Sequence, residues 1–178
     1  MDEQLRYLAD LIRQRNDVAI RITEMIGRPA LMGHIGEFIA SIVFDIFLYD
    51  SASHKGADGI FNSGRLAGST VDIKWYGKRE GLLDLKSDDG PDYYLVMTGP
   101  PGDAASSRGV TRLWGIENVY LFDHSKLVSD LHRRGIKVGV ASSVKKSYWE
   151  DAEVYPRSQS PLLTLSSDQR EVLKLFRR

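Results

Sequence analysis

Near the middle of the chain lies the stretch Val71-Asp72-Ile73-Lys74-Trp75-Tyr76, which alternates as a β-strand does. Successive side chains of a strand point to opposite faces, so the apolar residues at 71, 73 and 75 share one face. Asp72, Lys74 and Tyr76 share the other. That second face places a carboxylate beside an ammonium group, which is unfavourable unless the face is wet, paired or bound to a metal.

An acid-x-lysine triplet carries little weight alone, because a chain of this composition contains roughly one or two by chance. A second triplet, Asp84-Leu85-Lys86, is present. Its neighbours show no sustained alternation, which predicts a surface or turn segment. The triplet that begins at Asp72 is the one on a credible strand.

Segments on both sides of this strand predict a mixed sheet. Asp58–Phe61 and Leu66–Tyr76 have the pattern of a hairpin joined through Asn62-Ser63-Gly64. β-Branched and aromatic content predicts two further strands, Tyr93–Thr98 and Ile116–Phe122.

The next segment predicts a crossover unit. Asp123 or Ser125 caps a helix that runs to Arg134, and Gly135 ends it. Val138–Ala141 then returns as a strand. A strand, a helix and a strand in this order predict that the two strands lie parallel.

Three helices are expected outside this unit. Apolar residues in steps of three and four over Leu5–Ile26 predict an amphipathic helix, which Gly27-Arg28-Pro29 stops. Its apolar stripe indicates packing on the body, with a dimerisation seam as the alternative. Met32–Leu48 predicts a second helix, and Ser166-Ser167-Asp168 opens a last one that ends in Arg177-Arg178.

These elements place the chain in the α/β class, as one domain over residues 1–178. We expect an N-terminal helix over 1–27, a core over 28–150 and a C-terminal extension over 151–178. Asp50–Gly56 and Gly99–Gly109 are the expected loops, and the glycines and prolines of the second predict a mobile one.

Composition excludes several classes of protein. The chain has 178 residues, 42% of them hydrophobic, and no cysteine, which rules out disulfides, thiolate zinc sites and cysteine nucleophiles. The four histidines show no paired metal-ligand spacing. No apolar run approaches a membrane span and no signal pattern opens the chain, so we expect a cytoplasmic protein. Lys and Arg balance Asp and Glu at 24 each, so DNA binding requires local basic patches.

Two further acids accompany the central strand. Asp58 opens the neighbouring strand, and Glu37 lies on the preceding helix, off its apolar stripe. The order helix-Glu, strand-Asp, strand-Asp-x-Lys resembles the signature of the PD-(D/E)XK, or restriction-endonuclease-like, nuclease superfamily over about Gly33 to Ser143. Ala57 stands where the name-giving proline would be, and Asp72 replaces the commoner glutamate; the family tolerates both variants.

The resemblance implies a restriction-endonuclease-like αβββαβ core, a mixed sheet flanked by helices, with an extra N-terminal helix and a C-terminal helix here. It implies endonuclease cleavage of DNA that depends on Mg²⁺, with Mn²⁺ as a substitute, and leaves a 5′-phosphate and a 3′-hydroxyl. Asp58, Asp72 and the carbonyl of Ile73 would supply oxygen ligands, and Glu37 would bind directly, through water or at a second metal. Lys74 would orient the attacking water or stabilise developing charge.

Residues near this set are candidates for substrate binding. They are the basic-aromatic cluster Tyr76, Lys78 and Arg79, the pair His54 and Lys55 ahead of Asp58, and Ser143 and Lys145 after the expected crossover.

Structural interpretations of the same residues stay open. Asp72 and Lys74 can form a plain ion pair, Asp58 can be a turn residue before Gly59, and Glu37 can pair locally. A nuclease-fold protein that binds DNA or a protein partner without cleaving it is the alternative function, and a structural or oligomerising protein built on the N-terminal helix is the third. A nuclease that cuts two strands needs two sites, so we expect a homodimer, with the Leu5–Ile26 helix as its interface.

Overall fold

The computed structural model describes residues 2–50, 56–102 and 113–177. Its main sheet has six strands in the order β1-β2-β3-β5-β6-β8. These strands are β1 Ile46–Leu48, β2 Gly59–Phe61, β3 Thr70–Tyr76, β5 Tyr93–Thr98, β6 Asn118–Asp123 and β8 Glu153–Tyr155. A second sheet pairs β4 Leu82–Leu83 with β7 Ser142–Ser143. The helices are α1 Glu3–Ile26, α2 Met32–Phe44, α3 His124–Arg133, α4 Lys146–Ala152 and α5 Ser167–Lys174.

The main sheet is mixed, as expected for this α/β chain. β1, β2 and β3 follow one another antiparallel, and β3 then pairs with β5 in parallel. β5, β6 and β8 complete the sheet with antiparallel pairs. From α2 to β5 the chain thus contributes one helix and four strands of the main sheet. The first three strands are antiparallel, and the fourth is parallel to the third. The connection over residues 77–92, all of them described, contains β4 and no helix.

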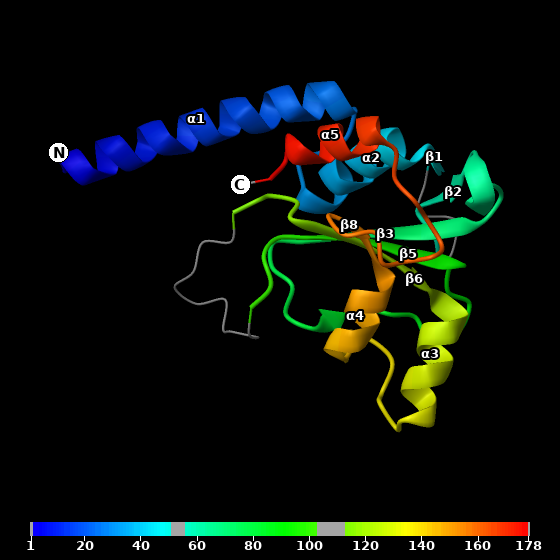
Figure 1. Ribbon diagram of the computed structural model, residues 1–178. Coiled ribbons are helices and arrows are strands. Elements are labelled where there is room, and N and C mark those ends of the chain that lie inside the picture. The colour runs from blue at the N-terminus through cyan, green and yellow to red at the C-terminus, as the bar shows by residue number, and fades with distance from the viewer. Residues whose placement is uncertain (1, 51–55, 103–112, 178) are drawn as a thin grey trace.

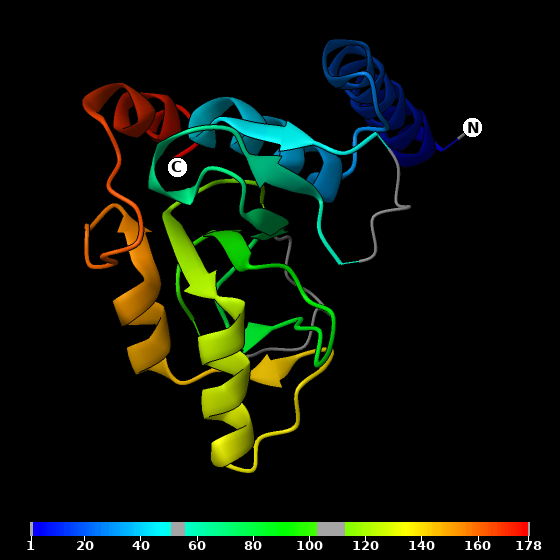
Figure 2. The ribbon, with the colours of Figure 1, turned by 90° about the vertical axis from the view of Figure 1, so that its right-hand side faces the viewer.

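Helices cover both faces of the sheet (Figure 1). α2 and α5 lie on one face, and α3, α4 and the small β4–β7 sheet lie on the other, as the turned view also shows (Figure 2). Each face has its own core cluster of buried side chains. Burial of apolar surface on the two faces is the main force that holds these layers together.

The expected alternation of the central strand is confirmed. Val71 and Ile73 are buried in the cluster under α2, with Trp75 packed against it. Asp72 lies opposite Tyr94 of β5, and Tyr94 belongs to the cluster on the other face. The hairpin of β2 and β3 is also confirmed, although its connection includes the 3₁₀ turn Gly64–Leu66 and so is longer than predicted.

The predicted end of the second helix is wrong. α2 ends at Phe44, and the next residue, Asp45, takes a left-handed conformation with φ 53°. The Asp45 carboxylate accepts hydrogen bonds from the side chains of Asn62 and Ser63, far along the chain. The apolar residues Ile46–Leu48, which also suit a helix, instead pair with β2.

The predicted parallel crossover is also wrong. Asp123, one of the two expected caps, is the N-cap of α3. Val138–Ala141, however, does not return as a strand of the main sheet. Val140 is 90% exposed and Ala141 has φ 55°, so this segment is a turn that leads into β7. The free edge of β6 is covered by β8, antiparallel. The parallel pair of the sheet is β3 with β5.

The terminal helices begin where the sequence predicts. α1 spans the expected range, and Gly27 closes it in a left-handed conformation with φ 68°. α5 opens with a capping box between Ser166 and Gln169, and it ends at Lys174 rather than at the last two arginines. Within residues 151–177, β8 joins the main sheet, and Leu173 of α5 is buried in the cluster under α2. No helix in the described ranges has the length and apolar character needed to cross a membrane.

Candidate active site at the β2–β3 junction

Asp58 is held at the point where β2 begins to pair with β3. Its N–H donates to the carbonyl of Val71 at 2.8 Å. Its carboxylate oxygen Oδ2 accepts the N–H of Ile73 at 2.7 Å. The Asp58 carboxylate thus accepts the hydrogen bond from β3 that a main-chain carbonyl would accept if β2 were longer. Two hydrogen bonds to one strand fix this carboxylate relative to the Asp-x-Lys triplet.

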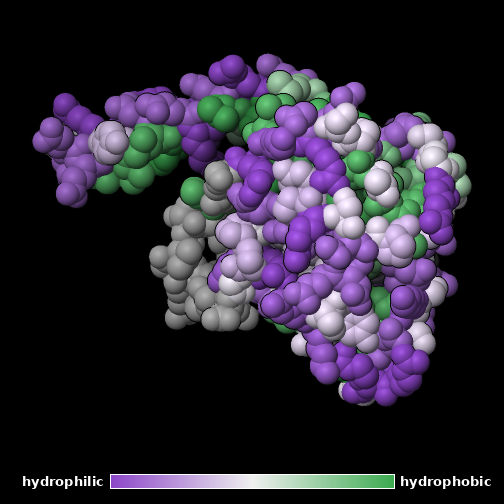
Figure 3. All heavy atoms as spheres, in the orientation of Figure 1, coloured by the Kyte–Doolittle hydropathy of each residue, from purple (hydrophilic) through white to green (hydrophobic). Residues whose placement is uncertain are grey.

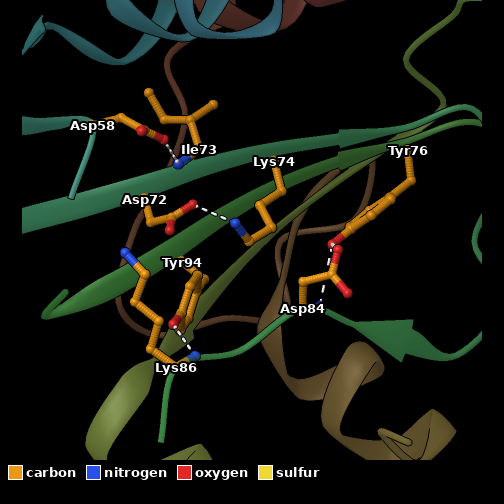
Figure 4. Close-up of polar contacts among 8 residues, drawn as sticks. All are labelled: Asp58, Asp72, Ile73, Lys74, Tyr76, Asp84, Lys86 and Tyr94. Atoms are coloured by element: carbon orange, nitrogen blue, oxygen red, sulfur yellow. Dashed lines mark hydrogen bonds and ion pairs between the residues drawn. The ribbon is translucent and has the colours of Figure 1, made fainter. Parts of the chain in front are cut away.

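Asp72 and Lys74 point from β3 to the face away from α2 (Figure 4). Lys74 Nζ donates to Asp72 Oδ1 at 2.7 Å, with the Asp72 side chain 8% and the Lys74 side chain 21% exposed. The ammonium nitrogen also lies 5.7 Å from the ring centroid of Tyr94. An ion pair with an aromatic ring beneath it keeps the lysine on the Asp72 carboxylate.

Burial raises the pKa of both carboxyls above the ordinary value of 3.8. For Asp58 the hydrogen bond from Ile73 acts in the opposite direction, and for Asp72 the charge of Lys74 does so. The negative charge of each acid also raises the pKa of a neighbouring one: that of Glu37 acts on Asp58, and that of Asp58 on Asp72. A site with this balance gains from an additional positive charge.

The main chain of Ile73 adds an oxygen at the same edge. In a strand the N–H and C=O of one residue point to the same neighbouring strand. Val71 accepts from Asp58, and the N–H of Ile73 donates to the Asp58 carboxylate, so both residues turn their polar groups toward β2. The carbonyl of Ile73 therefore faces the edge where Asp58 lies.

Glu37 approaches from α2, on the other side of β3. Gly36 allows that approach, since a Cβ at its position would lie 3.1 Å from Cβ of Trp75. Glu37 is close enough to Asp58 for its charge to raise the pKa of that carboxyl. Its own carboxylate is paired with Arg28, at the start of the same layer. The acid is thus near the junction but engaged with an arginine.

The sequence did not identify Lys86 as part of this group. Its charge lowers the pKa of both Asp58 and Asp72, and its main-chain N–H donates to the Tyr94 hydroxyl at 2.9 Å. Lys86 is exposed, as predicted for its triplet, but the surface prediction is wrong for Leu85, which is buried in the cluster under α3 and α4. The second Asp-x-Lys triplet is visible in the sequence, but it is interpreted as a surface or turn segment because it does not lie on a predicted strand. The connection from β4 to β5 brings it beneath the first (Figure 4).

Tyr76 is drawn toward Asp84 of the same second triplet. The hydroxyl of Tyr76 donates to Asp84 Oδ2 at 3.3 Å and accepts the Asp84 N–H at 3.2 Å. Asp84 Oδ1 in turn accepts the N–H of Ala141 at 2.7 Å. Burial raises the pKa of Tyr76 well above its ordinary value of 10.0. Tyr76 therefore links β3 to the small sheet as a neutral phenol.

The other expected substrate-binding residues lie apart from the two acids. Lys78 is 3.8 Å from Glu80, and Arg79 stacks near Tyr120 on the side of α4. Ser143 pairs with Leu82 in the small sheet, and Lys145 is the exposed residue before α4. His54 and Lys55 lie outside the described residues, as do residues 103–109 of the expected mobile loop.

The acids that come together are two, with a third nearby. Across residues 2–50, 56–102 and 113–177, no three His, Asp or Glu side chains are arranged to enclose a metal ion. Asp58 accepts the N–H of Ile73, and its charge raises the pKa of Asp72, so the oxygens of these two carboxylates and of the Ile73 carbonyl are the candidate ligands near this junction. Hard divalent cations such as Mg²⁺ take oxygen ligands and keep several waters, so this set fits a metal held partly by the protein and partly by water.

No protein-family model matches this sequence, and a search of curated proteins finds no significant relative.

Proposed function

We propose that this protein is a Mg²⁺-dependent endonuclease with a restriction-endonuclease-like core, which hydrolyses phosphodiester bonds in DNA. The observation that carries the proposal is the pair Asp58 and Asp72, a half-buried and a buried carboxylate of raised pKa at one strand junction. Burying two like charges together destabilises a fold, so such a pair is expected where a cation binds. The Asp-x-Lys spacing on β3 supports a nuclease in particular.

Asp58, Asp72 and the Ile73 carbonyl would hold the metal, with Glu37 through a water or after it leaves Arg28. When bound, Mg²⁺ supplies a more acidic water and neutralises charge on the phosphate. Asp58 is pre-oriented for this by the Ile73 N–H, and Asp72 by Lys74. Little reorganisation is therefore required of the two carboxylates.

Lys74 provides the second element of the chemistry. Its ammonium group donates to Asp72 and lies on the same face, so it can move to the attacking water or to a phosphate oxygen as negative charge develops there. Lys86 presents a second positive charge to the same acids from the other side of Tyr94. It would hold the non-bridging oxygens of the phosphate.

The first experiment is calorimetric titration of Mg²⁺ and Mn²⁺ into the wild type and Asp72→Asn, followed by incubation with supercoiled plasmid. We expect binding and nicking in the wild type, and a loss of at least about 100-fold in nicking in the variant, because one direct metal ligand is gone. Asp88→Asn is the matched control: it removes an exposed acid from the same region and should leave both signals unchanged.

Nicking that survives in Asp72→Asn would contradict the proposal, because contamination or another site would then be responsible. Metal binding without nicking of plasmid, linear duplex or single-stranded DNA would contradict the endonuclease assignment and keep only the metal site.

A second candidate is a nuclease-fold protein that binds DNA or a protein partner without cleaving it. The observation in its favour is that two of the expected catalytic groups are satisfied internally, Lys74 by Asp72 and Glu37 by Arg28. It predicts neither metal binding nor nicking. DNA binding that weakens with salt would then identify a DNA-binding protein, and its absence would point to a protein partner.

A further inference from the structure

Arg79 lies beyond the end of β3 in a rigid setting. Its N–H donates to the carbonyl of Pro100 at 3.1 Å, and its own carbonyl accepts the N–H of Gly102 at 3.0 Å. The guanidinium carbon lies 6.0 Å from the ring centroid of Tyr120 and 5.9 Å from that of Trp149. Both rings are almost fully buried. The side chain is therefore placed by packing on two aromatic rings.

This guanidinium lacks an acceptor where it needs one. Its Nε atom is buried and has no hydrogen-bond partner, and in the described part of the chain it is in no ion pair with a carboxylate. Leaving a buried donor of a charged group unpaired destabilises the fold, because the group has lost its water without gaining an acceptor. A buried donor left unsatisfied in this way is expected where a ligand supplies the missing acceptor.

Arg79 opens onto a cleft of about 370 Å³ between β6, α4 and the turn after β8. Two acids line the cleft, and each already has a cation of its own. Glu153 is held by Arg157, with Nη2 to Oε2 at 2.6 Å, and Glu150 by Lys146 at 3.4 Å. The charge of the cleft that remains uncompensated is thus the positive charge of Arg79.

We propose that this cleft is an anion site that binds the phosphate group of a phosphate ester. The guanidinium offers parallel N–H donors in a fixed plane, which match two oxygens of a phosphate. Asn118, at the start of β6, adds an amide to the same lining, and Lys146 and Arg157 stand at its rim. The phosphate can belong to a nucleic-acid backbone, which rests on the proposed nuclease function, or to a free nucleotide, which does not.

The site is separate from the junction of Asp58 and Asp72. Arg79 follows the strand that carries Asp72, yet it faces the side of α4, whereas Asp72 and Lys74 lie beside Tyr94 and Lys86. A nucleic acid at the Asp58 and Asp72 junction would need a second contact of this kind to fix its direction along the sheet. Phosphate contacts position a nucleic acid without reading its sequence.

The test is an NMR titration in which the indole N–H of Trp149 reports on the cleft, with EDTA present so that metal binding plays no part. Inorganic phosphate at constant ionic strength should give saturable shifts, and chloride should give none. Arg79→Met, which retains the bulk of the side chain without its charge, should weaken phosphate binding at least about tenfold. Arg133→Met, at an exposed arginine of α3, is the matched control and should bind as the wild type does.

Two further ligands distinguish the sources of the phosphate. An oligonucleotide without terminal phosphates that shifts Trp149 in an Arg79-dependent way would assign the site to a nucleic-acid backbone. Shifts with a nucleoside monophosphate but not with that oligonucleotide would assign it to a terminal phosphate. Shifts that are equal in Arg79→Met and the wild type, or none with any of the three ligands, would overturn the proposal. The phosphate titration can be interpreted even if the protein neither binds the metal nor nicks DNA.

Discussion

Among single residues, Asp58 and Asp72 are the clearest conflict between stability and chemistry. Burial raises the pKa of each, which means that the ionised form of each carboxyl destabilises the fold. Lys74 and the Ile73 N–H reduce this destabilisation without removing it. Strained groups of this kind are common at functional sites, where a stable fold around them supports the cost.

Asp58→Asn should therefore stabilise the metal-free protein at neutral pH. An acid whose pKa is raised on folding destabilises the fold once it ionises, so the gain is present above the raised pKa and disappears as the pH falls toward 3.8. The asparagine carbonyl can still accept from Ile73, so the strand contact is kept.

Thermal unfolding of both proteins in EDTA from pH 3.5 to pH 8 measures this effect, with Asp88→Asn as the control for loss of a surface charge. A variant that is less stable than the wild type at pH 7 would show that Asp58 is a structural residue of the turn. The same experiment with Mg²⁺ should raise the melting temperature of the wild type and of Asp88→Asn, but not that of Asp58→Asn.

At the scale of elements, the packing of α2 on β3 determines where Glu37 lies. The two meet at Gly36, where a Cβ would lie 3.1 Å from Cβ of Trp75 and 3.3 Å from Cε of Met97. Since protein interiors are close-packed, even one methyl group at this contact pushes the layers apart. Gly33, one turn earlier in the same helix, has no such neighbour within 4 Å.

Gly36→Ala and Gly33→Ala form a matched pair that measures this contact. We expect Gly36→Ala to destabilise the protein by about 1–3 kcal/mol through overpacking. Gly33→Ala should instead be neutral or stabilising by up to about 1 kcal/mol, because alanine favours a helix. Urea unfolding gives both values. Equal effects at the two positions would mean that α2 does not lie on Trp75 as closely as described.

At the scale of the whole molecule, α1 is the element that the described chain leaves least covered. All 24 of its residues are at least partly exposed, and it projects beyond the sheet (Figure 1). Its C-terminal half contributes to a groove with Ala30 and Trp114. Its N-terminal half carries Leu5 at 61%, Leu8 at 51% and Ile12 at 49% exposure, and Figure 3 shows apolar side chains along its underside.

We expect a second copy of the chain to cover this half of α1. Its apolar residues recur in steps of three and four, the spacing with which one helix packs against another of the same pattern. Ile12→Glu should convert the dimer to a monomer, whereas Arg21→Glu, at an exposed polar position of the same helix, should remain dimeric. Gel filtration with light scattering at micromolar concentration measures this. A monomeric wild type would contradict the prediction.

Much of the local structure could be predicted from the sequence, because it depends on neighbouring residues. The alternation at 71–76 predicts which side chains of β3 enter the core, and the hairpin with β2 follows from Asn62-Ser63-Gly64. Caps at Asp123 and Ser166 predict where α3 and α5 begin, since a side chain that accepts a nearby N–H is a local feature. The proximity of Asp58 and Asp72 follows from that hairpin alone.

The tertiary structure decided what depends on distant partners. Ile46–Leu48 suits a helix or a strand, and its pairing with β2, together with the contacts of Asn62 and Ser63 with Asp45, selects the strand. The apolar segment Val138–Ala141 was available as a strand, but β8 occupies the edge of β6. The path of the connection after β3 is not encoded in any local pattern. It places Lys86 near the two acids and Arg79 beside Tyr120 and Trp149. Hydrophobic periodicity determines the faces of an element, whereas competition among elements for the same edge and core determines which side chains meet.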